Sequence, residues 1–103
     1  MQFIVLGYDG SDEGALERRM AAREAHLKLF RETYDKGVFL FGSAILSDQG
    51  KMIGSMIVCD FSSREALEEK WLKDEPYVVG NVWKRIEVTP AMVPPFLLEK
   101  RMT

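Results

Sequence analysis

The sequence predicts an α+β fold of the ferredoxin-like type, in which two helices cover an antiparallel four-stranded sheet. Segments with strand and helix patterns follow the order β-α-β-β-α-β along the chain. The chain has 103 residues, which is close to the commonest size of a single domain. We therefore expect one domain over residues 1–90, followed by a C-terminal tail over residues 91–103.

The N-terminal third predicts a strand and a long helix. Residues 2–8 form a short apolar run, QFIVLGY, which is closed by the turn sequence DGSDEG. From residue 13 to residue 36 apolar side chains recur at helical spacings, and Gly37 is a suitable C-terminal stop. Candidate N-caps of this helix are Asp9, Ser11 and Asp12.

The remaining elements are a hairpin, a second helix and a fourth strand. Residues 38–46 and 52–61 have strand patterns and are joined by the turn sequence SDQGK. Ser62 or Ser63 is expected to cap a second helix over SREALEEKWL, which ends near KDEPY because Pro76 disfavours helix at the preceding residue. The sequence NVWKRIEVTP has the alternation of a strand and predicts the fourth one.

Three of the predicted strands indicate that both faces of the sheet are covered. The segments FIVL, VFLF and MIVC are apolar at both parities, so apolar side chains point to both faces. Two helices can cover one face, and the simplest cover for the other is a second copy in a two-fold homodimer, with the apolar tail at the interface. The alternative is that the tail folds over its own sheet. Pro94 and Pro95 predict no regular helix in the tail.

Charge and cysteine content exclude several classes of protein. The net charge is −2 and no run of like charge reaches five residues, so we expect no nucleic-acid partner. The single cysteine, Cys59, excludes an internal disulfide and a cysteine zinc site, and is expected to be a small buried residue. The apolar run at the start lacks a preceding basic region and is too short to span a bilayer. We therefore expect no membrane partner and a cytoplasmic location.

The only histidine, His26, occupies an unusual place on the first helix. The apolar stripe of this helix is formed by Leu16, Met20, Leu27, Phe30 and Tyr34. At about 100° per residue, Arg23 falls inside the stripe and His26 lies roughly 80° from its centre. We therefore expect His26 to be half covered at the edge between helix and sheet. It is either a structural residue bonded to a backbone carbonyl, with Arg23 extending to water, or a group placed for proton transfer.

Two further stretches contain candidate functional residues. KDEPYVVGN, residues 73–81, places two carboxylates before a rigid X-Pro turn, and a carboxylate beside an imidazole would fix its tautomer. Acidic residues before a proline also mark ordinary turns from helix to strand. In FGSA, Gly42 indicates either a β-bulge or a close approach to the backbone, and Ser43 offers an N–H and a hydroxyl that could hold a ligand oxyanion.

The stretches REAHL, GVFLFGS and EPYVVGNVW, in this order and spacing, resemble the YCII family of YciI-like proteins over about residues 1–90. The resemblance implies the dimeric α+β barrel fold and a site built on a His–carboxylate pair in a cleft of each subunit. By position, His26 matches the family histidine and Glu75 matches the aspartate that usually precedes the proline. Asp74 is the alternative carboxylate if the turn shifts by one residue. One family member removes chloride from a chlorinated hydroxyquinol without a metal or organic cofactor. The resemblance therefore implies that this chain, too, works without a metal or organic cofactor.

These residues lead to one functional hypothesis and two rivals. The hypothesis is an enzyme without cofactor or metal, of the isomerase or dehalogenating lyase type, that transfers protons on a small cyclic or phenolic acid. His26 would be the general acid or base and Glu75 or Asp74 would orient it. The expected substrate-binding residues are Arg23, Ser43 and Tyr77, with Glu75 as another possible partner of Arg23. The rivals are a non-catalytic small-molecule-binding homodimer and a monooxygenase of the same barrel type.

Overall fold

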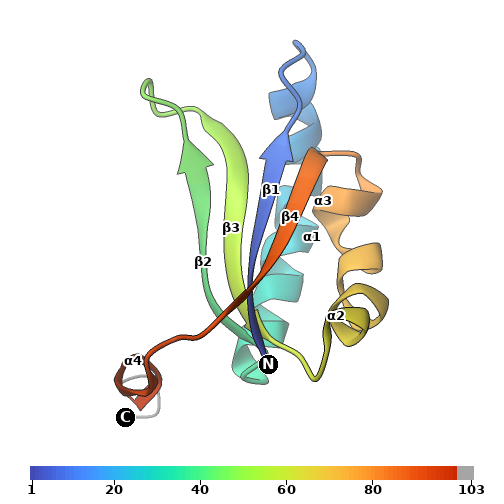
Figure 1. Cartoon of the computed structure of the whole chain (residues 1–103). Helices are drawn as coiled ribbons and strands as arrows, with labels where there is room; N and C mark the ends of the chain where they lie inside the picture. Colours follow the sequence, from blue (N-terminus) through green and yellow to red (C-terminus); the bar gives the residue numbers. More distant parts are fainter. Residues whose placement is uncertain (100–103) are drawn as a thin grey trace.

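The computed structural model describes residues 1–99, and the end of the predicted tail, residues 100–103, lies outside the described residues. The elements in order are β1 (Gln2–Asp9), α1 (Ala15–Asp35), β2 (Phe39–Leu46), β3 (Met52–Asp60), α2 (Arg64–Lys70), η1 (Leu72–Asp74), α3 (Pro76–Val79), β4 (Trp83–Ala91) and α4 (Pro95–Glu99). The four strands form an antiparallel sheet in the order β2-β3-β1-β4 (Figure 1). The predicted β-α-β-β-α-β order is therefore confirmed, with three short helical segments added to it.

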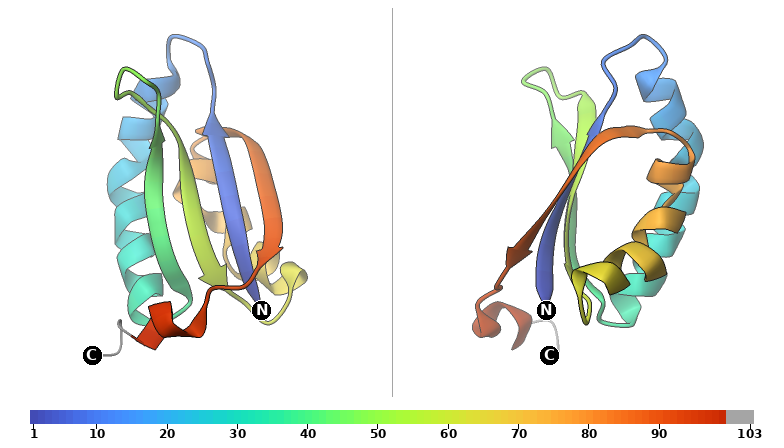
Figure 2. Two further views of the ribbon diagram at one scale, coloured as in Figure 1. Left: turned by 60° about the vertical axis from the view of Figure 1, so that its left-hand side comes forward. Right: turned by 45° about the vertical axis from the view of Figure 1, so that its right-hand side comes forward.

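Helices α1, α2 and α3 lie on one face of the sheet, and α4 lies beyond the other face (Figure 2). The hydrophobic core fills the space between the sheet and the three helices. Its buried members are Phe3, Val5, Phe39, Ile57, Cys59, Leu67, Trp71, Tyr77, Val82 and Trp83. Cys59 is a free thiol in this core, as expected. The core thus holds α1 and the segment from α2 to α3 against the same face of the sheet.

Helix α1 is rotated by roughly 90° from the orientation that its apolar stripe predicts. Its buried residues are Ala15, Arg19 and His26. The stripe residues Leu16, Met20, Leu27 and Tyr34 are exposed instead. The expectation that His26 is half covered is therefore wrong, because only 6% of the residue is exposed. Buried polar partners on the sheet and on the segment before α3 turn the polar side of the helix inward.

The predicted N-caps of α1 are wrong as well. The N-cap position is Gly14, where no side chain bonds to the backbone. Asp12 instead accepts two hydrogen bonds of 2.8 and 2.7 Å from the guanidinium of Arg18. The predicted stop is confirmed, because Gly37 follows the helix with φ of +79°, in the left-handed region that glycine adopts without strain.

Strand β2 has two register shifts, and neither lies at Gly42. Gly42 pairs regularly with Ile57, and the shifts lie between Phe39 and Phe41 and between Ile45 and Leu46. A Cβ at Gly42 would lie only 2.6 Å from ring carbons of Phe30. Of the two expectations for this glycine, the bulge is therefore wrong, and the close approach is made by the aromatic ring of α1.

The segment from α2 to α3 has the predicted serine cap and the predicted break before Pro76, and it adds two short helices, η1 and α3, that were not predicted from the sequence. The hydroxyl of Ser63 caps α2 by accepting a hydrogen bond of 3.0 Å from the N–H of Ala66, so Ser63 is the cap and Ser62 is not. After η1, Glu75 has the extended ψ of 128° that the following Pro76 requires. Pro76 then occupies the first position of α3, where its missing N–H is not needed.

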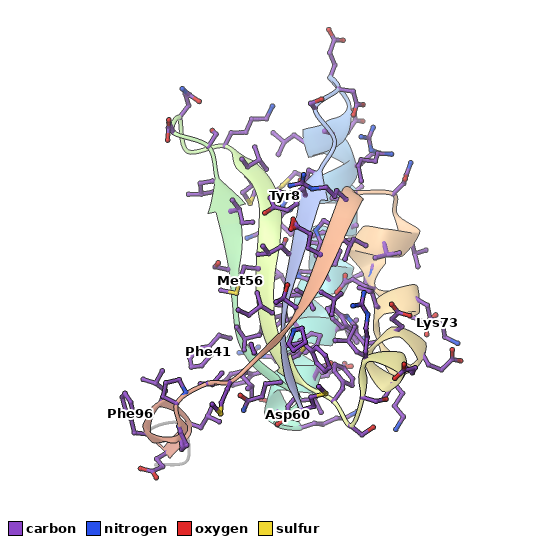
Figure 3. The ribbon with its side chains drawn as sticks, viewed as in Figure 1. Tyr8, Phe41, Met56, Asp60, Lys73 and Phe96 are labelled. Carbon is purple, nitrogen blue, oxygen red and sulfur yellow. The ribbon has the colours of Figure 1, made fainter. Side chains whose placement is uncertain are left out.

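The face of the sheet opposite α1 is apolar and only partly covered by the tail. Figure 3 shows Phe41 and Met56 on this side, turned away from α1. The tail meets this face around Ile4, Phe41, Met56, Val58 and Leu97. The expectation of no regular helix in the tail is wrong, because α4 begins at Pro95, where proline suits a helix start. Within residues 1–99, every helix is too short or too polar to cross a membrane.

Candidate functional site

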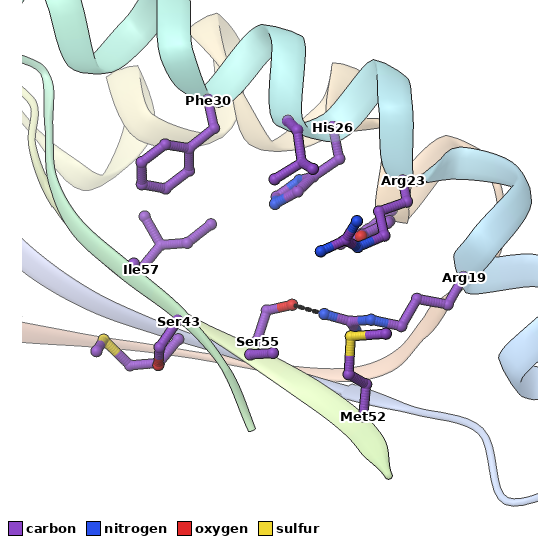
Figure 4. Close-up of a pocket in the computed structure, with 13 residues that line it drawn as sticks. Arg19, Arg23, His26, Phe30, Ser43, Met52, Ser55 and Ile57 are labelled. Atoms are coloured by element: carbon purple, nitrogen blue, oxygen red, sulfur yellow. Dashed lines mark hydrogen bonds between the residues drawn. The ribbon is translucent and has the colours of Figure 1, made fainter. Parts of the chain in front are cut away.

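A cavity of about 160 Å³ opens between α1 and the β2–β3 edge of the sheet. Helix α1 lines it with Arg19, Arg23, His26 and Phe30, strand β3 with Ser55 and Ile57, and α3 with Tyr77 (Figure 4). These residues come from segments far apart in the sequence. The cavity therefore exists only when α1 and α3 are packed on the same face of the sheet.

His26 and Glu75 form a buried pair beside this cavity. The Nδ1 atom of His26 lies 2.9 Å from Oε2 of Glu75, and Glu75 is completely buried. The same oxygen accepts a hydrogen bond of 2.9 Å from the backbone N–H of Tyr77, and Oε1 accepts one of 3.2 Å from Nε1 of Trp71. A carboxylate removed from water needs such donors. The three donors hold it in one orientation against the imidazole.

The local backbone explains why Glu75 takes this position. Pro76 forces an extended conformation on Glu75, and this ends the preceding helical turn. Glu75 then serves as the N-cap of α3, whose second residue donates its N–H to the carboxylate. The cap turns the side chain back toward α1, where His26 lies.

The ring of His26 is fixed on the side of Nδ1 and free on the side of Nε2. It stacks on the ring of Tyr77, with centroids 4.0 Å apart and planes tilted by 13°, and the edge of Trp83 lies near it. Nε2 has no hydrogen-bond partner among the described residues. When Nδ1 carries the proton that is donated to Glu75, Nε2 presents a lone pair at the cavity, which is the state of a general base.

A second buried cluster lies at the base of the cavity and was not predicted from the sequence. Nη1 of Arg19 donates to both carboxylate oxygens of Asp9, at 3.0 and 3.2 Å, and Nη2 donates to the hydroxyl of Ser55 at 2.8 Å. The Cζ atom of Arg19 lies 4.7 Å from the centre of the Tyr77 ring. Arg19 precedes His26 by two helical turns, which places both on one face of α1. The burial of Arg19 was not predicted, because the apolar stripe predicts that the neighbouring face of α1 is the buried one.

Burial changes the titration of two groups in this region. Burial raises the pKa of Asp9, and the neighbouring Arg19 offsets part of that rise. Burial also raises the pKa of Tyr77, with Arg19 and Arg23 opposing the rise. The hydroxyl of Tyr77 therefore stays protonated at neutral pH and can donate a hydrogen bond to a ligand oxygen.

Of the other predicted site residues, Arg23 and Ser43 lie at the cavity and Asp74 does not. Arg23 lines the cavity and makes no hydrogen bond or ion pair with another described residue, so it does not pair with Glu75. Asp74 is exposed and lies outside the cavity lining, so the turn is not shifted by one residue. Ser43 borders the cavity. Its hydroxyl points to the opposite face, because Ser43 lies between two residues whose partners on β3 face α1.

Metal-binding groups do not converge at this site. Among residues 1–99, no three side chains of histidine, cysteine, aspartate or glutamate lie close enough together to hold a metal ion. The polar side-chain groups that line the cavity are an imidazole, two guanidinium groups, a serine hydroxyl and a phenol. These can move a proton and bind oxygen atoms of a ligand.

Comparison with known proteins gives a consistent result for the sequence. Residues 1–92 match the family model of the YCII-related domain. The chain is 29% identical over 96 residues to Protein YciI of Escherichia coli O6:H1, and this alignment covers 87% of this chain and 95% of that protein. The Protein YciI of Shigella flexneri matches with the same identity and coverage.

A solved structure has the same fold. It is 5-chloro-2-hydroxyhydroquinone dehydrochlorinase (TftG) from Burkholderia phenoliruptrix AC1100, in complex with 2,5-dihydroxybenzoquinone. The TM-score is 0.76 at 19% sequence identity, and the match covers 93% of this chain and 98% of that one. The predicted α+β fold of the dimeric barrel type is thereby confirmed.

Proposed function

Because this chain belongs to the family of YCII-related domains, we propose that it is an enzyme that transfers protons on a small cyclic or phenolic acid without a cofactor. The reaction would be an isomerisation or the elimination of a leaving group such as chloride. The observation that carries this proposal is the hydrogen bond between Nδ1 of His26 and the fully buried Glu75, at the wall of a cavity.

His26 is the general base in this proposal, and Glu75 is the residue that orients it. The carboxylate keeps the proton on Nδ1 and stabilises the imidazolium that forms when Nε2 takes a second proton. A positioned base of this kind contributes roughly 10²–10⁴-fold to a rate. Tyr77 supports the ring from one face and can donate its hydroxyl hydrogen to the ligand.

The two reaction types share their first step. Nε2 of His26 removes a proton from a ring hydroxyl or ring carbon of the substrate, and the electron pair that is released moves into the ring. In the elimination, His26 returns this proton to the ring carbon that bears the chlorine, which becomes tetrahedral. A second ring hydroxyl is then deprotonated, its electron pair forms a carbonyl group, and chloride leaves with the electron pair of the broken carbon–chlorine bond to give a quinone. In the isomerisation, His26 returns the proton to a different atom of the same ring. In both reactions the products together contain the same number of electrons as the substrate. Neither reaction therefore needs an external oxidant or reductant.

The size of the cavity supports a ligand with a single ring. The cavity encloses about 160 Å³, and an engineered protein cavity of about 150 Å³ holds one benzene molecule. The structural relative was solved with a single-ring quinone, 2,5-dihydroxybenzoquinone. A substrate with one six-membered ring and oxygen substituents is therefore the class that we propose.

The test measures chloride release from 5-chloro-2-hydroxyhydroquinone, together with uptake of solvent deuterium into a panel of related phenolic acids. We expect turnover by the unmodified chain, loss of at least about 100-fold in Glu75→Gln and His26→Gln, and unchanged turnover in Asp74→Asn. Asp74 is a matched control, since it is the neighbouring carboxylate and lies outside the cavity. Binding of these compounds without turnover would favour the rival, a non-catalytic small-molecule-binding domain.

We also propose that the protein works as a homodimer, with the apolar face of the sheet and the tail over residues 91–103 at the interface. Phe41 on this face is 40% exposed, and Met92 and Phe96 in the tail are 87% and 60% exposed. Large apolar side chains that gather on one face of a small protein commonly mark an interface. A second copy placed sheet against sheet would cover them.

A further inference from the structure

The cavity beside His26 has charge at one end only. Arg19 and Arg23 are the only lysine, arginine, aspartate or glutamate residues that line it, as far as the described residues show. The carboxylates of Asp9 and Glu75 lie behind Arg19 and His26 and do not line the cavity. A ligand in the cavity therefore meets two guanidinium groups without meeting a carboxylate.

Arg19 is a fixed cation with unused donor capacity. It is 3% exposed, and its Nη1 and Nη2 atoms are held by Asp9 and Ser55. Its Nε atom is buried without any hydrogen-bond partner among the described residues. A buried N–H without a partner is unfavourable, and native proteins keep such groups rarely. Arg19 lines the cavity, so its positive charge acts on an acceptor that a ligand places there.

Arg23 completes the charged end. It is an exposed residue that lines the cavity, and it makes no hydrogen bond or ion pair with another described residue. A free guanidinium presents a planar fork of N–H groups that matches the two oxygens of a carboxylate. Arg19 is held by its partners, whereas the guanidinium of Arg23 has no partner among the described residues and is available to a ligand beside Arg19.

The opposite end of the cavity is apolar. In Figure 4, Phe30 and Ile57 lie on one side, Arg19 and Arg23 lie on the other, and His26 lies between them. Phe30 reaches its place because Gly42 carries no side chain. The cavity can therefore hold a ligand in one direction only, with the charged group beside the arginines and the ring beside Phe30 and Ile57.

We propose that Arg19 and Arg23 form an oxyanion subsite that determines the specificity of the cavity for a single-ring carboxylate or phenolate. Asp9 is a positioning residue, because it holds Arg19 from outside the cavity lining, and Ser55 also holds Arg19 from within the lining. The bound oxyanion places a ring atom beneath Nε2 of His26. This inference rests on the proposed function only for the role of His26; binding of the oxyanion requires the two arginines.

The experiment uses benzoate as the probe and benzamide as its neutral counterpart of the same shape. Both are titrated into the unmodified chain by calorimetry, at low and at high salt. We expect benzoate to bind at least about tenfold more tightly than benzamide, as one charge-assisted hydrogen bond would provide. Equal affinity for the two compounds would overturn the proposal.

Three variants separate the contributions of Arg19 and Arg23 to the preference for benzoate. Arg23→Gln should reduce the preference for benzoate by about tenfold, whereas Lys28→Gln, an exposed cation of the same helix outside this cavity, should leave it unchanged. Because loss of Arg19 alone would leave Asp9 buried without its partner, the neutral pair Asp9→Asn with Arg19→Gln is used, and it should also reduce the preference. If neither arginine variant changes the preference, the subsite does not exist.

A last variant distinguishes this inference from the proposed function. His26→Gln should keep the preference for benzoate within about threefold, because less than 1 kcal/mol of binding depends on the imidazole when the arginines hold the charge. A protein that prefers benzoate but turns over none of the test substrates would retain the subsite and lose the proposed reaction. Loss of the preference in His26→Gln, with both arginines intact, would contradict the assignment to Arg19 and Arg23.

Discussion

Glu75 is the residue on which the geometry of the site depends most. It is fully buried, and its two oxygens accept from an imidazole, an indole and a backbone amide. Removal of one donor leaves part of the carboxylate unsatisfied in a place that water reaches poorly. The contact to Trp71 is the one that can be deleted with least disturbance to the backbone and to His26.

We expect Trp71→Phe to lower the free energy of unfolding by about 1.5–3 kcal/mol more than Trp83→Phe, and to lower turnover as well. Both changes remove the same atoms from a buried side chain. Nε1 of Trp71 donates to Glu75, whereas Nε1 of Trp83 has no partner among the described residues. Denaturant unfolding of the two variants measures the difference. Equal destabilisation would mean that the indole hydrogen bond does not support the carboxylate.

Part of this residue-scale geometry was predictable from the sequence. The X-Pro rule gave the extended conformation at Glu75, and the resemblance to the YCII family paired this residue with His26. The role of Arg19 was not predictable, because a charged residue on a helix is exposed unless a buried partner is known. Its partner, Asp9, was instead assigned as a helix cap, since strand ends and caps share the same residue types.

At the scale of elements, the contact between α1 and β2 determines the shape of the cavity. The sequence predicted the order, the type and the approximate bounds of the long elements, because periodicity and glycine or proline boundaries are local signals. It did not predict the rotation of α1, which depends on buried polar contacts with other elements. It also did not predict α3, because a helix of four residues has too few residues for a periodic pattern.

Gly42→Ala is expected to push the ring of Phe30 out of its place, since the new Cβ would lie 2.6 Å from that ring. Overpacking of this kind destabilises a protein by about 1–3 kcal/mol, and the displaced ring should also weaken binding of benzoate. The double variant Gly42→Ala with Phe30→Leu should recover much of the stability, because leucine is smaller. Thermal unfolding measures both effects. A Gly42→Ala chain as stable as the original would show that the ring does not depend on this glycine.

At the scale of the whole molecule, one face of the sheet is covered by three helices and the other is left apolar. The strands are apolar at both parities, which is the pattern of a sheet buried on both sides. The tail covers only the region around Phe41 and Met56. A second copy is the cover that we propose, and it would turn the sheet of one chain into half of a barrel.

Sedimentation should therefore give twice the mass of the chain at micromolar concentration. Phe41→Glu should yield monomers, because it places a charge on the apolar face. Val79→Glu is the control, since Val79 is 71% exposed on α3, on the opposite side of the sheet. A monomeric wild-type chain, or a Phe41→Glu variant that still sediments as a dimer, would contradict the proposed interface.

The most direct test of the central claim is the protonation pattern of the His26 ring, measured by nitrogen NMR on the unmodified chain. The chain has one histidine, so one set of ring signals must be assigned. The pairing with Glu75 predicts that the neutral ring carries its hydrogen on Nδ1 and leaves Nε2 without one. A neutral ring with its hydrogen on Nε2 would show that the carboxylate does not hold it, and the base would no longer face the cavity.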